Sequence, residues 1–316
     1  MSNGETVETG IAWHYTTSAG LRGIIEANAL RASSAAFMND ANEMRTGVGA
    51  LRSTYDRIKS SLTKAECDEI ERGSFLQDSV VDKWYLVSAS TSRDLLTLWR
   101  SYGAGASYAI GFDAAVKLHP IEHIAGEANP SPPPGFYDDA YEEIDGRPVR
   151  LYNPDGVGVF GGSWRTVAYV DPKGEKSHEE EVRTFAKRGA TAAESDSFLI
   201  DLGVFAESDV NYEKDLAFVD ERETRIVVEV TPSWKFVQYR ESRFGIVPFV
   251  ELGSGAVHAG IGRYVPRGAR EPLPIREVMI GPSPLDSRAA ERALRQFLDD
   301  RGYGEVAISR SETPFR

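Results

Sequence analysis

Two carboxylates and a guanidinium alternate along the segment Asp220–Val230. The segment reads as a charged loop that turns into a β-strand, and side chains two residues apart on a strand share one face. We therefore expect Glu221, Glu223 and Arg225 on one face, opposite the apolar side chains that belong to the core. Such a group can hold hydroxyls and stabilise developing positive charge. The alternative is a solvent-facing ion pair at the end of a strand.

Further candidates for chemistry lie on three expected elements earlier in the chain. His14 follows Trp13 on a short strand, where it either presents its ring to a ligand hydroxyl or is a hydrogen-bonded core residue. Ser88 and Ser90 share one strand face and can bind a ligand or only their neighbours. The aromatic rings of Trp99 and Tyr108 either stack on a flat ligand ring or pack in the core.

Other reaction types have weak support in the sequence. His119 and His123 are four residues apart, but Pro120 falls between them in a loop-like setting, so they do not form a helical pair of metal ligands. Cys67 is the only cysteine and has no marked base nearby, and no Gly-x-Ser-x-Gly motif is present. Residues 103–105 lack the third glycine of a dinucleotide-binding fingerprint. We expect no metal.

Composition indicates a folded protein that does not bind nucleic acid over a broad surface. The 316 residues are 41% hydrophobic and 10% aromatic, which is enough to bury a core. The net charge of −12 argues against an extensive basic surface for phosphates. The first ten residues are polar and no apolar run is long enough to cross a membrane, so we expect a soluble cytoplasmic protein.

The hydrophobic pattern predicts an α+β fold, because strands outnumber helices and do not alternate regularly with them. We expect one domain over residues 1–316, with a loop-rich insertion at about 119–162 that is marked by proline and glycine. Strands are expected at residues 11–16, 30–33, 84–90, 107–112, 166–170, 226–230, 235–240, 245–252, 275–280 and 305–309.

Helices are expected early, in the middle and late in the chain. The first is capped by Ser18 and fades near Asn28. The second opens at Asp40, which forms a capping box with Glu43, and runs toward Ile58. Further helical stretches are residues 60–80, 94–102, 176–210 and 287–300.

Nine short motifs in chain order resemble those of a bacterial family catalogued as domain of unknown function 2971. They cover nearly the whole chain apart from the insertion and the outer helices. They are His14-Tyr15-Thr16, Phe37-Met38-Asn39-Asp40 with Glu43, Ser88-Ala89-Ser90, Leu98-Trp99-Arg100-Ser101-Tyr102, Ala109-Ile110-Gly111-Phe112-Asp113, Val167-Ala168-Tyr169-Val170, Glu221-Arg222-Glu223-Thr224-Arg225, Ile280-Gly281-Pro282 and Ser311-Glu312-Thr313-Pro314-Phe315-Arg316.

That family in turn resembles the ADP-ribosyltransferase superfamily, which implies a bent, split β-sandwich with peripheral helices that holds NAD in a cleft. The superfamily triad is a His or Arg on an early strand, a Ser or Tyr on a later element, and a Glu on a strand near the end. His14 matches the first position and Glu223 the third. Ser88 or Ser90 matches the serine form of the second position, and Tyr108 the tyrosine form.

The resemblance also implies a role for each residue. Glu223 would hold the ribose hydroxyls and stabilise an oxocarbenium-like transition state as the nicotinamide–ribose bond breaks. Glu221 would orient or deprotonate the acceptor. His14, with Tyr15 and Thr16 beside it, would bind the adenosine-side ribose.

Two further roles stay open at this point. Trp99 or Tyr108 would pack against the nicotinamide ring, and Arg225 would pair with Glu223 or reach a phosphate. The Glu-x-Glu spacing is similar to branches that modify arginine, whereas a first-position His is similar to the polymerase-like branch.

The implied function is transfer of ADP-ribose from NAD to an unknown acceptor, protein or nucleic acid, in bacterial defence or as a toxin. The alternatives are an NAD glycohydrolase, in which water is the acceptor, and a non-catalytic binding module on the same fold.

Overall fold

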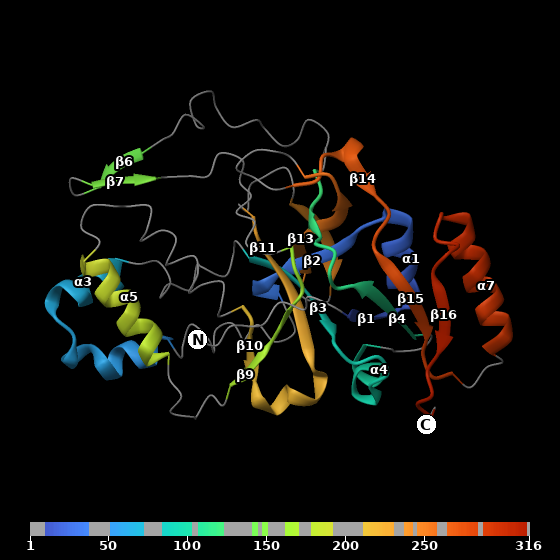
Figure 1. The fold of residues 1–316 in the computed structure, drawn as a ribbon, viewed down its shortest axis with the longest axis horizontal. Coiled ribbons are helices and arrows are strands. Elements are labelled where there is room, and N and C mark those ends of the chain that lie inside the picture. The colour runs from blue at the N-terminus through green and yellow to red at the C-terminus, as the bar shows by residue number, and fades with distance from the viewer. Residues whose placement is uncertain are drawn as a thin grey trace.

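The chain folds around one large, mostly antiparallel β-sheet with helices against it, which makes it an α+β protein (Figure 1). The computed structural model describes residues 10–37, 51–72, 84–102, 107–122, 141–144, 147–150, 162–170, 178–191, 211–230, 237–242, 245–257, 264–283 and 287–314. Within these residues, no helix is long and apolar enough to cross a membrane.

The strands are β1 (Ile11–Thr17), β2 (Leu30–Ser34), β3 (Trp84–Ser90), β4 (Ser107–Asp113), β5 (His119–Pro120), β6 (Tyr141–Ile144), β7 (Arg147–Arg150), β8 (Arg165–Thr166), β9 (Ala168–Val170), β10 (Glu213–Asp215), β11 (Glu223–Glu229), β12 (Gln238–Ser242), β13 (Gly245–Gly255), β14 (Arg270–Glu271), β15 (Ile275–Ile280) and β16 (Ala307–Arg310). The helices are α1 (Ser18–Ala27), α3 (Lys64–Arg72), α4 (Leu96–Tyr102), α5 (Glu179–Thr191) and α7 (Ser287–Asp300), with 3-10 helices η1 (Ala35–Phe37), η2 (Lys59–Ser61), η5 (Leu216–Glu221) and η6 (Arg267–Ala269). Residues 51–58 are also helical.

The main sheet has the order β12-β13-β2-β3-β1-β4-β15-β16, and it forks at β3. One edge of β3 pairs with β11 along the whole of both strands. The other edge changes partner: residues 85 and 86 pair with β2, whereas Ser90 pairs with Trp13 of β1. β1 and β3 share only that one register pair, so the two halves of the sheet diverge from β3.

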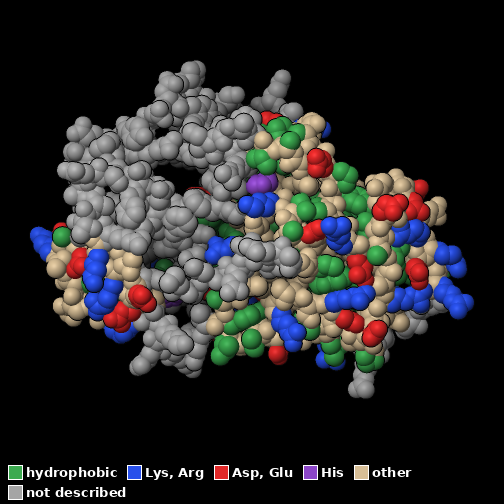
Figure 2. Space-filling model, in the orientation of Figure 1, with side chains coloured by type: hydrophobic (Ala, Val, Ile, Leu, Met, Phe, Trp, Pro, Cys, Tyr) green, Lys and Arg blue, Asp and Glu red, His purple; other side chains and the backbone are tan. Residues whose placement is uncertain are grey.

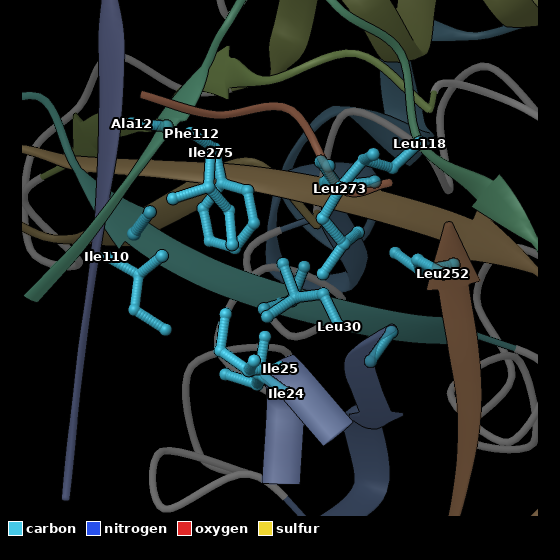
Figure 3. Packing of buried hydrophobic residues seen from close by; sticks show 14 of the residues in the cluster. Ala12, Ile24, Ile25, Leu30, Ile110, Phe112, Leu118, Leu252, Leu273 and Ile275 are labelled. Atoms are coloured by element: carbon cyan, nitrogen blue, oxygen red, sulfur yellow. The ribbon is translucent and has the colours of Figure 1, made fainter. Parts of the chain in front are cut away.

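The main apolar core lies against one face of this sheet. Helix α1 packs on β1 and β4 and buries Leu21, Ile24 and Ile25, which follow helical spacing. In Figure 3 the last two of these lie close to Leu30 of β2. Helix α7 adds Leu294 and its neighbours to the same core. Leu21 and Leu294, which are 273 positions apart in the chain, therefore share one interior.

A second, smaller apolar cluster joins the helix at 51–58 to α3 and α5. It consists of Leu51, Tyr55, Ile58, Ile70, Val182 and Ala186. In Figure 1 helices α3 and α5 lie side by side at one end of the molecule, away from α1 and α7. The polar helical stretch expected at 60–80 is confirmed over the residues of α3.

Most of the expected elements are confirmed. Strand β15 and helix α7 have the predicted bounds, and β1, β2, β3, β4 and α4 agree within two residues. The described part of the insertion at 119–162 contains β5 and the β6–β7 hairpin, and its proline-rich segment lies outside the described residues. The capping box of Asp40 and Glu43 also lies outside them.

Three local predictions were wrong. Helix α1 is capped by Thr17 and not by Ser18, because the Thr17 side chain accepts a hydrogen bond from the Gly20 amide at 3.2 Å. Strand β12 begins at residue 238 and not at 235. The single strand expected at 166–170 is divided into β8 and β9, because the partner strand changes: β8 pairs with β11, whereas β9 pairs with β10.

The cap of α1 gives a direct test of the local structure. Thr17→Ala removes the side-chain acceptor, so we expect the free energy of unfolding to fall by about 1 kcal/mol. Ser18→Ala is the matched control, and it should change stability by less than about 0.5 kcal/mol because Ser18 is exposed and caps nothing. Urea denaturation measures both variants, and a larger loss for Ser18→Ala would contradict the assignment.

Candidate functional site

Glu223 is the first residue of β11, and its carboxylate is buried and bound on both oxygens. The Arg225 side chain donates from Nε to Oε1 at 2.5 Å and from Nη2 to Oε2 at 3.1 Å. The Lys214 ammonium donates to Oε2 at 2.8 Å. Because only 5% of Glu223 is exposed, these two cations replace the water that the carboxylate has lost.

Lys214, on β10, joins the two glutamates. Its ammonium also donates to Oε2 of Glu221 at 2.9 Å, and its side chain is 2% exposed. The nitrogen lies 4.8 Å from the ring centroid of Phe218, an aromatic contact that favours a cation. The sequence analysis did not single out Lys214, although a lysine between Tyr212 and the apolar residues of η5 was the available signal.

Glu221 lies off the strand, at the end of η5, which corrects the expectation that it shares the β11 face with Glu223. The cause is Arg222, whose left-handed backbone (φ 46°) turns the chain between η5 and β11. The two carboxylates come together through Lys214 and not through strand alternation. Glu221 is the more accessible of the two, with 14% of its side chain exposed.

Arg225 is held from both sides. Besides Glu223, it donates from Nη1 to the carbonyls of Asn211 at 3.0 Å and Glu213 at 3.4 Å. Of the two roles left open by the sequence, the structure contains the pairing with Glu223. The solvent-facing ion pair is wrong, because both side chains are buried under the 211–215 segment.

The backbone around Glu223 is fixed by two neighbouring segments. The Glu223 amide donates to the Tyr169 hydroxyl at 2.7 Å. Ser90 donates from its hydroxyl to the carbonyl of Glu221 at 2.8 Å and accepts from the amide of Ser92 at 3.0 Å. The Ser90 hydroxyl is therefore committed to holding the turn that carries Glu221.

Burial by itself would raise the pKa of Glu223, but the adjacent charges of Arg225 and Lys214 outweigh it and lower the pKa from 4.5 to about 2. The carboxylate is therefore ionised at any physiological pH. An ionised carboxylate fixed in a dry setting is the arrangement that stabilises a developing cation most strongly.

Ser88 lies on the same face as this cluster, since it is the register partner of Arg225. Its hydroxyl is buried and has no hydrogen-bond partner within the described residues. Buried hydroxyls normally find a partner, so this one is available for a ligand group.

His14 lies at the fork between β1 and β3. Its Nδ1 donates to the carbonyl of Ser88 at 2.9 Å, so Nε2 carries the lone pair of the neutral ring and can accept from a hydroxyl. Burial lowers the pKa of His14 below 6.5, although the bond to Ser88 opposes the shift. The ring is therefore neutral near pH 7.

The strand register places His14 and Glu223 on opposite faces of the sheet. Trp13 pairs with Ser90, and Ser90 pairs with Glu223, so these three side chains share one face. His14 is the next residue along β1, and its register partner Ile110 belongs to the main core.

The predicted site residues therefore fall into three groups, of which the pair Tyr15 and Trp99 is described below. Thr16 and its register partner Tyr108 lie on the His14 face, and burial raises the pKa of Tyr108. The structure does not bring these residues to the glutamates. Glu221, Glu223, Arg225, Ser88 and Ser90 form the second group.

Tyr15 and Trp99 pack against each other in an apolar cluster next to the site. Their rings meet edge-on with centroids 4.6 Å apart. The Tyr15 hydroxyl donates to the carbonyl of Ser92 at 3.1 Å and accepts from the amide of Leu95 at 2.9 Å. Burial raises the pKa of Tyr15 to about 12, so it stays neutral.

Asp94, which the sequence analysis passed over, anchors this cluster to the C-terminal motif. Its carboxylate accepts from Nε1 of Trp99 at 2.6 Å, from the Ser311 hydroxyl at 2.7 Å and from the Thr313 hydroxyl at 3.0 Å. The amide of Glu312 donates to the second oxygen at 2.8 Å. These bonds lower the pKa of Asp94 against the opposing effect of burial.

Comparisons of the chain with protein-family models, with curated proteins and with solved structures found no match. The resemblance to a known family therefore stays a prediction that rests on the motifs. Among the described side chains, no three His, Cys, Asp or Glu residues are grouped so as to hold a metal ion.

Removing the Glu223 charge leaves two buried cations without their partner. We expect Glu223→Gln to lower the free energy of unfolding by about 3 to 5 kcal/mol. Glu251→Gln on β13 is the matched control, and it should cost less than about 1 kcal/mol because Glu251 only meets the half-exposed Arg31 at 4.0 Å. Chemical denaturation at pH 7 measures both, and equal losses would contradict the account.

Stability should also depend on pH through the same carboxylate. Its pKa is about 2 in the folded chain and 4.5 as a free side chain, so the unfolded state binds more protons between these values. Glu223 therefore contributes about 3 kcal/mol above pH 4.5, and this contribution is lost as the pH falls toward 2. Denaturation curves from pH 7 to 3 should show a loss that is smaller in Glu223→Gln, and parallel curves would contradict it.

Proposed function

We propose that the protein is an NAD-dependent ADP-ribosyltransferase, which cleaves the nicotinamide–ribose bond and transfers ADP-ribose to a macromolecular acceptor. The observation that carries the proposal is the buried, ionised Glu223 beside the unpartnered hydroxyl of Ser88. These residues lie on β11 and β3, and the next strand, β1, carries His14. The three positions expected from the family resemblance thus lie on three neighbouring strands at the fork, which supports a split-sheet fold of the ADP-ribosyltransferase type.

Cleavage of the nicotinamide–ribose bond requires a fixed negative charge next to an oxocarbenium-like ribose. Glu223 supplies it, since Arg225 and Lys214 keep the carboxylate ionised and hold its position. The Ser88 hydroxyl gives the ribose or the nicotinamide amide a hydrogen-bonding partner. The partners of Glu223 must share the carboxylate with the ribose hydroxyls, and an ionised carboxylate has about four acceptor positions for this.

His14 contacts the dinucleotide from the other side of the fork in this proposal. Its Nε2 accepts from a hydroxyl of the adenosine-side ribose, because Nδ1 is already committed to the carbonyl of Ser88. The fork is the place where a ligand has access to residues of both faces, because β1 and β3 pair only through Trp13 and Ser90.

In this proposal Glu221 is the glutamate that contacts the acceptor. It is the more exposed glutamate, and the exposed side chains of Leu216 and Val219 on the same 3-10 helix suit a macromolecular surface better than water. Figure 2 shows Lys and Arg interspersed with Asp and Glu over the described part of one face, without a broad basic region. Together with the net charge of −12, this favours a protein acceptor over nucleic acid.

A non-catalytic module is the second candidate, and one observation favours it. Both oxygens of Glu223 already have cationic partners, as in an ion pair whose role is only structural. The two candidates differ in whether the protein consumes NAD.

Incubation with NAD that is labelled in the adenylate phosphate, with and without cell lysate, tests the proposal. The wild-type protein should release nicotinamide and label a macromolecule. Glu223→Gln should lower the rate of release by roughly 100- to 1000-fold, since it removes charge stabilisation from the transition state. Glu251→Gln should keep the wild-type rate, and circular dichroism establishes that each variant is folded.

Each outcome of this experiment separates one of the candidate functions from the others. Nicotinamide release that survives in folded Glu223→Gln would overturn the assignment of that residue. Release without labelled macromolecule identifies a glycohydrolase, and protease or nuclease sensitivity of the label identifies the acceptor class. An absence of NAD binding in calorimetry would leave the non-catalytic module.

A further inference from the structure

Lys214 is the one described side chain whose charge contacts both glutamates. A single nitrogen lies 2.9 Å from Oε2 of Glu221 and 2.8 Å from Oε2 of Glu223. The Lys214 side chain is 2% exposed, so both contacts are buried ion pairs and not exposed surface pairs. Arg225 donates to both carboxylate oxygens of Glu223.

Two carboxylates held this way would repel each other without the lysine. Both oxygens touch one nitrogen, so they are no more than about 6 Å apart, a separation at which like charges disfavour the charged forms. Burial weakens solvent screening and adds to the effect. Such pairs take up a shared proton, and the pKa values then belong to the pair.

The other charged groups around the pair do not replace Lys214. Glu213, the preceding residue on β10, pairs with Nε2 of His178 at 3.3 Å, where the chain enters α5. The guanidinium carbon of Arg165 on β8 lies 4.1 Å from the ring centroid of Tyr212. From β9, the Tyr169 hydroxyl accepts from the backbone amide of Glu223.

We propose that Lys214 is a positioning residue whose single ammonium bridges Glu221 and Glu223 and holds the two carboxylates side by side. The inference deepens the proposed function, on which its catalytic consequence rests. The electrostatic part is a property of the protein without NAD.

The consequence follows from the balance of charges. Lys214 and Arg225 match the formal charges of the two glutamates in the cluster. Lys214→Met keeps the length of the side chain but leaves one negative charge in excess, which a proton on a glutamate relieves. The site would then hold one carboxylate fewer for ribose or acceptor as the pH falls. Lys214→Arg keeps the charge and should keep both carboxylates.

The first test follows Glu223 directly, by ¹³C NMR of its side-chain carboxyl during a pH titration in the absence of NAD. We expect the titration midpoint in Lys214→Met to rise by at least one pH unit and to stay near the wild-type value in Lys214→Arg. In the double variant Lys214→Met with Glu221→Gln the rise should be at least halved, since the second glutamate is gone.

A purely structural lysine would not show this pattern. An unchanged midpoint in Lys214→Met would overturn the proposal, and so would a rise that Glu221→Gln does not reduce. If Lys214→Met fails to fold, the double variant decides. Recovery of the folded state supports repulsion between the glutamates as the defect, and continued failure contradicts it.

The second test is the pH profile of kcat/KM for nicotinamide release. The acid limb in Lys214→Met should move upward by the same amount as the Glu223 midpoint, so the loss of activity relative to the wild type should grow as the pH falls toward that midpoint and be absent at pH 8. A uniform loss at all pH values would contradict a positioning role. If the wild type releases no nicotinamide, the proposed function fails, while the titration still decides the role of Lys214.

Discussion

The ion pair between Glu223 and Arg225 is the interaction on which this side of the molecule depends. Taking these charges out of water is costly, and only close pairing with further hydrogen bonds offsets the loss. The partners come from outside the main sheet: Lys214 on β10, the Tyr169 hydroxyl on β9 and the carbonyl of Asn211. The small β9–β10 sheet is therefore held against β11 by charge and hydrogen bonds as well as by apolar contact through Tyr212 and Val227.

The fork at β3 is the second constraint, and it determines what the ion-pair cluster can reach. A regular sheet would separate the two faces completely, since alternate side chains point to opposite sides. Here the ladder between β1 and β3 stops after one pair, and the His14 ring bonds to the Ser88 carbonyl beyond it. The His14 side chain thus supplies the hydrogen bond that a backbone amide would supply in a continuous ladder.

Sequence patterns predicted the elements well and the site in part. Sequence patterns alone gave helix α7, which has an amphipathic period, and strand β15, which has a short apolar run with clear flanking residues. The shared face of Glu223 and Arg225 followed in the same way. Their burial did not, because the covering segment at 211–215 has no periodic pattern of its own.

Other features of the site depend on information that no local pattern contains. The position of Glu221 depends on the left-handed turn at Arg222, a residue type that seldom adopts that conformation. The separation of His14 from Glu223 depends on the register between β1, β3 and β11, which is set by pairing between distant strands. The partners of Lys214 depend on distant pairing in the same way, since they are defined only once β10 is in place.

The carboxylate of Asp94 has a consequence for the order in which the protein is made. Its partners at Ser311 and Thr313 follow 217 and 219 residues later, so a ribosome has to complete most of the chain before they exist. Until then, the seven residues of helix α4 have the bond between Asp94 and Trp99 and the contacts with Tyr15 of β1, and a helix of this length is marginal by itself in water. Because α4 contacts η5, the turn that carries Glu221 gains its final support only after Ser311 and Thr313 have been added to the chain.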